Sequence, residues 1–282
     1  MPETPYRSLG SLALYGTDPD GVTWSVQGPE SSDWWASAAS TASVIQRPRA
    51  HGAFVGRGFL DPARYVVVVQ MHARTEAGLR RAIDRLHAAA SLAPTTLTVT
   101  EDGGPRTAVV QREDQVLVRR PHPLSAVASV QLVAPDPRKM GVLLTANTGL
   151  PSTSGGLTIP FTVPFTIGAT QVTGQVSLTN PGNIAGPVRL RIDGPVTAPV
   201  VTHVGTGRSL VFASSLVLGW GEFVVVDMER HEVLAQGQAS RNQWVTERGW
   251  SAFEPGPNTW AFSAADPSTW AKLTVEAVPS WM

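Results

Sequence analysis

The sequence has no cysteine among its 282 residues. Disulfide bonds and thiolate metal sites are therefore excluded, and apolar packing has to hold the fold together. Lysine is also scarce, because Lys139 and Lys272 are the only two and arginine carries the remaining positive charge. No run of apolar residues is long enough for a membrane-spanning helix, and no charged segment followed by an apolar core opens the chain. We therefore expect neither membrane insertion nor a signal peptide.

The chain also lacks a net charge, because 22 basic residues balance 22 acidic ones. Without a strong overall field, nucleic acid and anionic membranes are not expected partners. An apolar content of 42% is enough for a substantial core. The 26 glycines and 23 prolines are spread along the chain, which favours many short strands joined by turns.

One helix is predicted, over residues 75–93. Thr75 is a plausible N-cap, Glu76 is favourable toward the helix dipole, and Pro94 ends the helix. Apolar residues recur at three- and four-residue steps and mark one face, at Leu79, Ala82, Ile83, Leu86 and Ala90.

Strands are predicted on both sides of this helix. The β-branched run at residues 63–73 is typical of a strand that is buried on both faces. After the helix, runs at 95–100, 106–111, 116–120 and 127–134 predict an antiparallel meander. The first part of the chain is therefore expected to be an α+β domain, in which one helix covers one side of the sheet.

Residues 18–58 differ from their surroundings. They are poor in periodicity and rich in Ser, Ala, Gly and Pro, yet they contain Trp24, Trp34 and Trp35. Disordered segments are depleted in aromatic residues, so we expect this segment to become ordered against its own domain or a neighbouring subunit. The three tryptophans are the candidate interface residues.

A domain boundary is predicted at Pro135, Asp136, Pro137 and Arg138. Proline donates no hydrogen bond to a sheet, so the two prolines are expected to end the last strand of the first domain. Residues 141–156 form a plausible linker, and we divide the chain into domains 1–145 and 146–282.

The second domain is predicted to be a jelly-roll β-sandwich. About nine short strands with glycine and proline at their corners follow the linker, and no helical pattern occurs among them. Pro160 and Pro164 would confine the run at 157–167 to a sheet edge. Trp250, Trp260 and Trp270 are predicted to fill the core of the sandwich.

No catalytic, cofactor or metal site is predicted. The six histidines lack metal-ligand spacing, and the glycine-rich 205–210 is expected to be a hairpin turn. Asp227, Glu229 and Glu232 lie in a predicted hairpin, and paired carboxylates are typical of glycosidases. Charged residues at a hairpin tip are more often only solvated. Trp34 and Trp35 suit an aromatic platform for sugar, although core packing or an interface anchor is commoner.

The order of several motifs resembles the distal tail proteins of phages. An N-x-G, a P-x-x-x-I-x-G-P strand, a G-E-x-x-x-x-D strand and a W-x-x-L-x-P-G-x-N-x-I-x-F corner follow one another in that family. The matching residues are Asn180, Gly182, Pro187, Gly194, Pro195, Gly221, Glu222, Asp227, Trp250, Pro255, Gly256, Asn258 and Phe262. Phe253 and Trp260 stand where Leu and Ile are usual, and the strand ending at residue 140 resembles the end of the family's N-terminal domain. The resemblance extends over about residues 54–281.

This resemblance implies a structural protein of the virion, made in the cytoplasm of the bacterial host and located at the distal end of a siphophage tail. The first domain would form a homo-hexameric ring, with a belt-like segment at about 18–58 reaching the next subunit. The second domain would be a galectin-like sandwich that holds receptor-binding or side proteins. The ring would join the tail tube protein to the tail-tip hub protein.

Two other functions stay open. Jelly-roll sandwiches often bind sugars, so the second domain is alternatively a carbohydrate-binding module for host adsorption, to which Arg189, Arg191 and Glu222 would contribute. A glycosidase or esterase has little support, because no arrangement of nucleophile, acid and base is recognisable. We therefore expect a protein that is not an enzyme.

Overall fold

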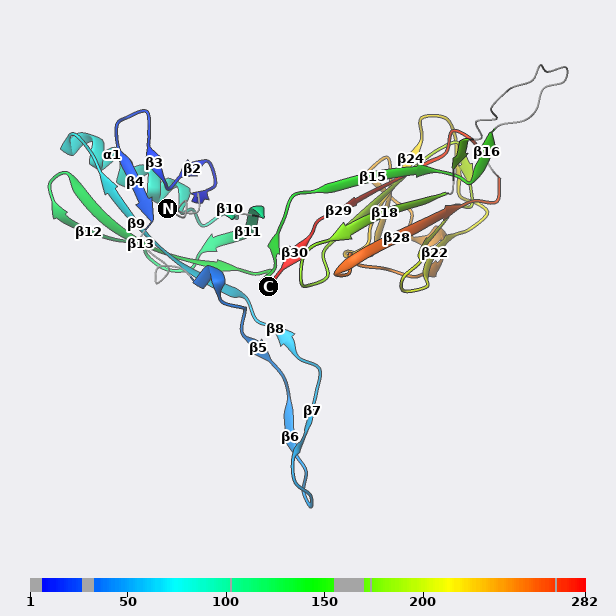
Figure 1. Cartoon of the computed structure of the whole chain (residues 1–282), viewed down its shortest axis with the longest axis horizontal. Coiled ribbons are helices and arrows are strands. Elements are labelled where there is room, and N and C mark those ends of the chain that lie inside the picture. The colour runs from blue at the N-terminus through cyan, green and yellow to red at the C-terminus, as the bar shows by residue number, and fades with distance from the viewer. Residues whose placement is uncertain (1–6, 27–32, 102, 155–169, 173, 267) are drawn as a thin grey trace, which may run out of the picture. The chain divides into compact units, whose positions relative to one another are not determined.

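The structure, a computed structural model, describes residues 7–26, 33–101, 103–154, 170–172, 174–266 and 268–282. The chain folds as two compact units, one of Met1–Gly141 with Met282 and a second of Val142–Trp281. Each unit has its own core of buried apolar residues. The described part is mainly β-structure with one α-helix (Figure 1), which confirms the predicted fold class.

The first unit is built on one sheet with the strand order β2-β1-β10-β11-β13-β9-β4-β3, and β12 and β14 pair with β13 and β11. The pairs are antiparallel, and β13 pairs with β9 along its full length. The strands are β1 (Arg7–Leu9), β2 (Leu12–Ala13), β3 (Gly16–Thr17), β4 (Thr23–Val26), β9 (Ala63–His72), β10 (Thr95–Glu101), β11 (Gly104–Arg112), β12 (Leu117–His122), β13 (Ser125–Ala134) and β14 (Lys139–Met140).

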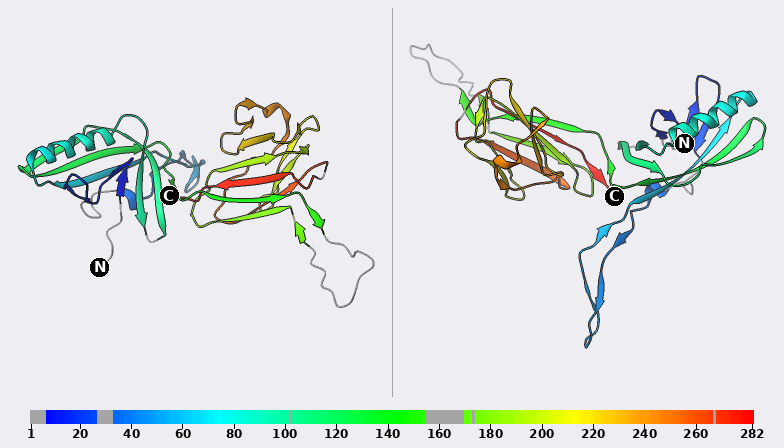
Figure 2. Two further views of the ribbon diagram at one scale, coloured as in Figure 1. Left: turned by 90° about the horizontal axis from the view of Figure 1, so that it is seen from above. Right: turned by 180° about the vertical axis from the view of Figure 1, so that it is seen from behind.

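The predicted helix is confirmed as α1 (Glu76–Ala89), which runs along one face of this sheet (Figure 2). The Thr75 hydroxyl accepts a hydrogen bond from the backbone N–H of Gly78 at 3.1 Å, as expected of an N-cap. Leu79, Ala82 and Leu86 are fully buried against the sheet. The helix therefore supplies the cover for one sheet face only.

The prediction that the strand at 63–73 is buried on both faces is wrong. Burial alternates along β9, with Val67 and Val69 buried and Val66 and Val68 only half-buried. The reason is that α1 covers one face, whereas no element of the described residues forms a layer over the other face. We call this uncovered side the open face, and its apolar members, placed by strand register and exposure, are Val66, Val68, Val109, Leu117, Val127 and Val133.

Asp18 ties the first loop to the helix. Its carboxylate accepts hydrogen bonds from the indole N–H of Trp24 at 2.8 Å and the backbone N–H of Val22 at 2.9 Å. It also pairs with the Arg85 guanidinium at 2.6 Å. Burial alone would raise the pKa of Asp18, but these donors outweigh it and hold the pKa below its ordinary value. The ionised carboxylate therefore stabilises the folded state.

We expect Asp18→Asn to lower the free energy of unfolding by about 2 kcal/mol at neutral pH, because it weakens charge-assisted hydrogen bonds. A depressed pKa contributes stability above the unfolded value of about 3.9 and loses it as pH falls through the folded value. The difference between wild type and variant in thermal unfolding should therefore shrink below about pH 4. Asp20→Asn is the control, since Asp20 contacts the same Arg85 from a more exposed position. A difference that is independent of pH would contradict this role.

The second unit is a β-sandwich of two antiparallel sheets, as predicted, with strand orders β15-β29-β19-β24-β25-β26 and β18-β28-β21-β22-β27. The first sheet contains β15 (Leu144–Gly149), β19 (Val188–Asp193), β24 (Phe223–Asp227), β25 (Glu232–Ala235), β26 (Ala239–Ser240) and β29 (Lys272–Ala277). The second contains β18 (Gln175–Asn180), β21 (Val200–His203), β22 (Arg208–Phe212), β27 (Val245–Arg248) and β28 (Gly256–Ser263). Shorter strands are β16 (Ser152–Ser154), β17 (Thr170–Val172), β20 (Val196–Thr197), β23 (Val217–Leu218) and β30 (Ser280–Trp281).

Part of the predicted linker is sheet structure. β15 lies inside the segment 141–156 and pairs with β29 along all of its length, so it belongs to the second unit. The segment Leu144–Gly149 has no apolar pattern typical of a strand, because β15 lies at the sheet edge and half of its residues face outward. The run at 157–167, with Pro160 and Pro164, lies outside the described residues.

The motif residues of the second unit hold its loops together. The Asn180 amide donates to the carbonyl oxygens of Phe253 at 2.7 Å and Ile184 at 3.2 Å, and its oxygen accepts from the Gly182 N–H at 2.8 Å. A Cβ on Gly182 would collide with the carbonyl oxygen of Ser280, so only glycine fits there. In the corner motif, the buried Asn258 side chain bonds to the Glu254 backbone. These motifs are therefore structural.

Asn180→Ala should lower the free energy of unfolding by about 1–3 kcal/mol, because it leaves the buried carbonyl oxygen of Phe253 without this donor. Thr179→Ala, at the neighbouring exposed position of β18, is the matched control and should change little. Urea unfolding of the two variants gives the comparison. Equal effects at the two positions would show that Asn180 does not hold the loops.

Candidate subunit interface

A two-stranded hairpin, residues 39–61, extends from the sheet of the first unit (Figure 1), and we call it the arm. At its base β5 (Ser40–Thr41) pairs with β8 (Phe59–Leu60). Further out β6 (Val44–Gln46) pairs with β7 (Ala53–Val55), and the Arg47 N–H bonds to the Gly52 carbonyl at the turn. Its strands pair only with each other within the described residues, so both faces of the hairpin are open.

The arm exposes large apolar side chains. These are Val44, Ile45, Phe54, Val55 and Phe59, each between 60% and 69% exposed. Monomeric soluble proteins rarely expose a contiguous apolar patch of this kind unless it binds something. A two-stranded hairpin by itself is also only marginally stable in water. The arm is therefore a candidate contact surface.

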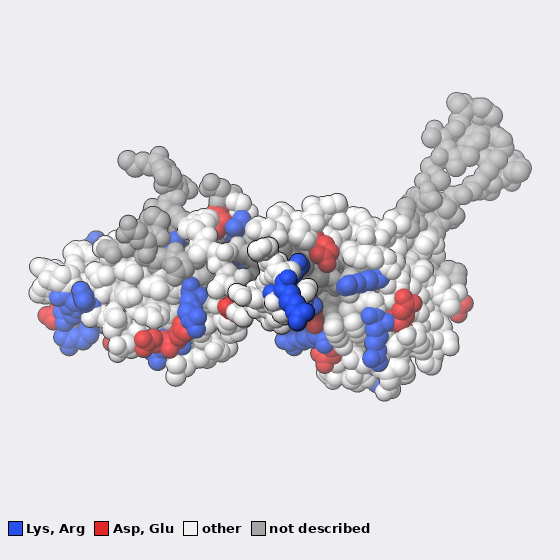
Figure 3. All heavy atoms as spheres, turned by 90° about the horizontal axis from the view of Figure 1, so that it is seen from below, with Lys and Arg blue, Asp and Glu red and all other residues white. Residues whose placement is uncertain are grey.

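The arm is also basic. It contains Arg47, Arg49 and Arg57 against the single acid Asp61. The Arg47 guanidinium lies 4.9 Å from the centre of the Phe54 ring, and that of Arg57 lies 5.4 Å from the Phe59 ring. Figure 3 looks at the molecule from the side to which the arm extends and shows basic side chains gathered on it. The surface of the arm therefore combines apolar and cationic side chains.

Trp34 anchors the arm to the sheet. It lies in a short 3-10 helix (Asp33–Trp35) just before the arm and is 1% exposed. Its indole N–H donates to Glu101 Oε1 at 2.8 Å, and Glu101 Oε2 pairs with Arg106 at 3.0 Å. Its ring centre lies 5.4 Å from that of Tyr65 on β9. Also at the base of the arm, the Thr41 hydroxyl donates to the Asp61 carboxylate at 2.9 Å.

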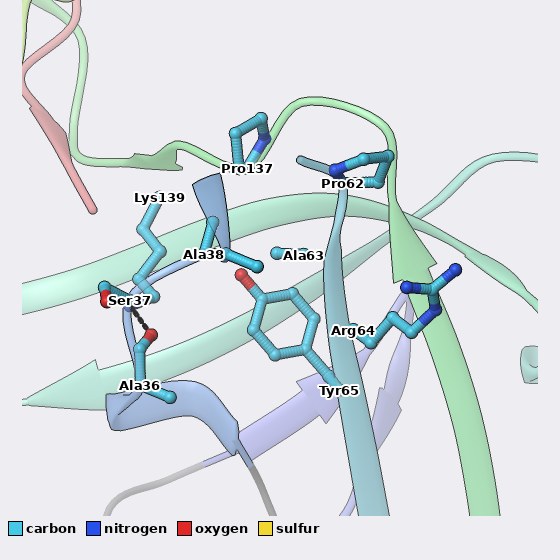
Figure 4. A pocket seen from close by; sticks show the side chains of 10 residues that line it. Ala36, Ser37, Ala38, Pro62, Ala63, Arg64, Tyr65, Pro137 and Lys139 are labelled. Atoms are coloured by element: carbon cyan, nitrogen blue, oxygen red, sulfur yellow. Dashed lines mark hydrogen bonds between the residues drawn. The ribbon is translucent and has the colours of Figure 1, made fainter. Parts of the chain in front are cut away.

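A pocket of about 240 Å³ lies beside this anchor, where the arm leaves the sheet (Figure 4). It is lined in part by Ala36, Pro62, Tyr65 and Lys139. The buried Lys139 ammonium lies 3.4 Å from the Ala36 carbonyl oxygen and 5.5 Å from the Trp34 ring centre. Burial lowers the pKa of Lys139, against the opposing attraction of Glu101. Burial raises the pKa of Tyr65 to about 12, with a further contribution from Asp136.

The three candidate tryptophans do not share one surface. Trp24 and Trp34 are each 1% exposed, within the core of their own unit, whereas Trp35 is 59% exposed. The expectation that Trp24 and Trp34 contact a neighbour is therefore corrected: their rings and their indole N–H groups are used internally. The segment 18–58 divides likewise, because β4 joins the sheet and only the arm extends from it. The sequence of residues 18–58 has too little apolar periodicity to predict which part joins the sheet and which part forms the arm.

The predicted boundary residues form a turn after β13. The Asp136 carboxylate accepts from the Arg138 backbone N–H at 3.0 Å and from its guanidinium at 2.7 Å. Burial alone would raise the pKa of Asp136, but these bonds to Arg138 keep it below its ordinary value. Pro135 precedes Asp136, and Pro137 stands between Asp136 and Arg138. The boundary between the two units lies between Gly141 and Val142, three residues after Arg138. The domain division predicted between residues 145 and 146 instead falls within β15.

One of the three hairpin carboxylates considered for catalysis, that of Asp227, has a structural role. Asp227 Oδ1 accepts from the backbone N–H groups of Glu229 and Arg230 at 3.0 and 2.9 Å, which closes the turn between β24 and β25. Among the described residues, no group of three or more His, Cys, Asp or Glu is arranged to hold a metal ion. No helix in the described ranges is long and apolar enough to cross a membrane.

Comparison with solved structures identifies the fold. The Dit protein of phage SPP1 aligns with a TM-score of 0.67 over 99% of this chain and 100% of that chain, at 13% sequence identity. The chain has the fold of SPP1 Dit. That protein is described as a paradigm of the hub adsorption apparatus in phages that infect Gram-positive bacteria.

The sequence resembles the distal tail proteins, and the similarity to Dit confirms that resemblance at the level of the fold. Two structures of the phage P2 baseplate in its activated conformation, with Ca and with Sr, align at a TM-score of 0.47. They cover 96% of this chain and 97% of theirs, at 11% and 12% identity. No family model and no curated protein sequence matches the chain.

Trp34→Ala should lower the free energy of unfolding by about 3–5 kcal/mol, because it empties a buried site and removes the donor to Glu101. Trp35→Ala, one residue away and exposed, should change it by less than about 0.5 kcal/mol. Urea unfolding followed by circular dichroism measures both. Similar losses for the two variants would contradict the assignment of Trp34 as the anchor.

Proposed function

We propose that this chain is a structural adaptor of a phage tail tip whose copies join in a closed, hexameric ring. The observation that carries the proposal is the arm, which is anchored by Trp34 and exposes five large apolar side chains. The similarity to SPP1 Dit over nearly the whole chain supports a tail-tip role. The number of copies follows from the resemblance to the distal tail proteins.

A ring requires two different complementary patches on each copy. The arm supplies one patch. The open face of the first unit supplies a second, because no described segment covers its valines on β9 and β13. In the proposed ring the arm of one copy lies on the first unit of the next, so that the apolar side chains of both leave water. Trp35, exposed beside the arm, belongs to the same contact.

The two units have separate tasks in this proposal. The first, residues 1–145 in the sequence division, forms the ring, and the second, residues 146–282, displays a sandwich to receptor-binding or side proteins. The ring joins the tail tube protein to the tail-tip hub protein. The protein acts in the virion, after synthesis in the bacterial host, and is not an enzyme.

The arm is tested by Ile45→Asp combined with Phe54→Asp. These residues face each other across β6 and β7 and are exposed in the single chain, so their loss should leave thermal unfolding of the monomer unchanged. Light scattering should give the mass of a hexamer for the wild type and of a monomer for the variant. A charge in an apolar contact costs far more than one in water.

Val204→Asp is the matched control, because Val204 is 51% exposed but lies after β21 in the second unit. It should leave the assembly intact. An assembly that survives the double arm variant, or a wild type that stays monomeric at high concentration, would contradict the proposal.

A further inference from the structure

Two tryptophans of the second unit lie against each other in solvent. Trp220 is 70% exposed and Trp270 is 67% exposed, and their ring centres are 5.5 Å apart with the planes tilted by 55°. The prediction that Trp270 fills the core is wrong, whereas Trp260 at 0% exposure does so. Each indole carries about 150–250 Å² of surface, so exposing two together leaves a large aromatic area without cover.

Sheet topology brings the two residues together. β24 and β29 both pair antiparallel with β19, one on each side of it. Both strands therefore begin at the end of the sheet where β19 finishes at Asp193. Trp220 precedes β24, and Trp270 precedes β29, so that residues fifty positions apart in sequence meet at one end of this sheet.

Tight turns fix the backbone at both tryptophans. The turn that carries Trp220 is closed by two bonds between Gly219 and Glu222: the Gly219 N–H donates to Glu222 Oε2 at 2.7 Å, and the Glu222 N–H donates to the Gly219 carbonyl at 3.2 Å. Gly221 within it has a φ of +77°, which favours glycine. Gly194 presses against the carbonyl oxygens of Leu218 and Gly219 and leaves no room for a Cβ.

The turn of Trp270 is built on Ser268. The Trp270 N–H donates to the Ser268 hydroxyl at 3.3 Å, and the Ala271 N–H donates to the Ser268 carbonyl oxygen at 3.3 Å. Ala271 itself is buried at 2% exposure and fixes the turn to the core. The two indoles are therefore presented by ordered backbone, and binding a ligand would cost little conformational entropy.

Charged side chains occupy outward positions of the strands that begin at this pair. The Arg191 guanidinium lies 3.8 Å from the Phe223 ring centre and donates to Asp193 at 2.7 and 2.9 Å. Asp193 stands opposite Phe223 on one side and Lys272 on the other. The outward row of these three strands has three basic residues and three acidic ones, namely Arg189, Arg191, Lys272, Asp193, Asp227 and Glu276.

This balance bears on the class of ligand. An anionic polymer would require an excess of basic side chains, and a cationic one an excess of acidic side chains. A protein partner would need about 800 Å² of complementary surface with an apolar centre. The outward row of the adjoining strands instead carries charges of both signs. Flat aromatic rings beside side chains that both donate and accept hydrogen bonds suit a neutral ligand with apolar ring faces and hydroxyl edges.

We propose that Trp220 and Trp270 form a binding platform for neutral oligosaccharides. One sugar ring stacks on each indole, and Asp193 and Lys272 at the neighbouring strand ends provide hydrogen bonds to hydroxyl groups. The platform lies in the second unit and does not depend on the proposed ring, because it needs no contact from the arm.

The test is binding of the full-length chain to an array of short, neutral oligosaccharides of hexose and N-acetylhexosamine, with affinities from titration calorimetry. The wild type should bind at least one of them. Trp220→Ala and Trp270→Ala should each weaken that binding by roughly tenfold or more, as loss of a central aromatic contact does. Both residues are exposed, so thermal unfolding of the variants should match the wild type.

Val204→Ser is the matched control for an exposed apolar side chain elsewhere in the second unit and should bind as the wild type does. The proposal is overturned if the wild type binds no neutral oligosaccharide on the array. It is also overturned if the double variant of Trp220 and Trp270 binds as well as the wild type, or if Val204→Ser loses binding equally. Light scattering of the Trp variants should show an unchanged assembly, which separates this outcome from any failure of the ring.

Discussion

Burial of Trp34 at the base of the arm is the interaction on which the proposed assembly depends. The indole fills the core of the first unit against Tyr65 and donates to Glu101, which Arg106 in turn holds. The arm alone is a two-stranded hairpin, too small to be stable in water without support. Because its root is fixed in the core, its apolar residues are presented to a partner with less entropy to lose. A fixed root and an exposed tip are what the proposed contact between copies requires.

In the second unit too, the residues that maintain the fold differ from those that we propose bind a ligand. Asn180, Gly182 and Asn258 satisfy buried backbone groups and allow close approach of the loops, so the motifs shared with the distal tail proteins maintain the sandwich. Trp220 and Trp270 belong to none of those motifs and are held out in solvent. A scaffold with fixed loop contacts can change such exposed residues without loss of stability, so recognition can vary while the fold persists.

Local patterns predicted the helix, the hairpins and the sandwich, because periodicity and turn residues act over a few neighbours. They did not predict which face of β9 is covered, since Val66 and Val67 are chemically alike and only the position of α1 distinguishes them. Nor did composition tell Trp34 and Trp260, which are buried, from Trp35 and Trp270, which are exposed. The sequence also did not predict the arm, because its strands are short and pair only with each other among the described residues. The contact between Trp220 and Trp270 could be found only from the sheet topology, because fifty residues separate them in the sequence.

The absence of cysteine permits a direct test of the arm's contact. A single Ile45→Cys chain can be labelled with a benzophenone, mixed in equal amounts of ordinary and 15N-labelled protein, and irradiated. The account predicts crosslinked peptides of mixed isotope composition that join residue 45 of one copy to the first unit of another, at the open face. Crosslinks confined to peptides of one isotope composition, or to the second unit, would contradict it.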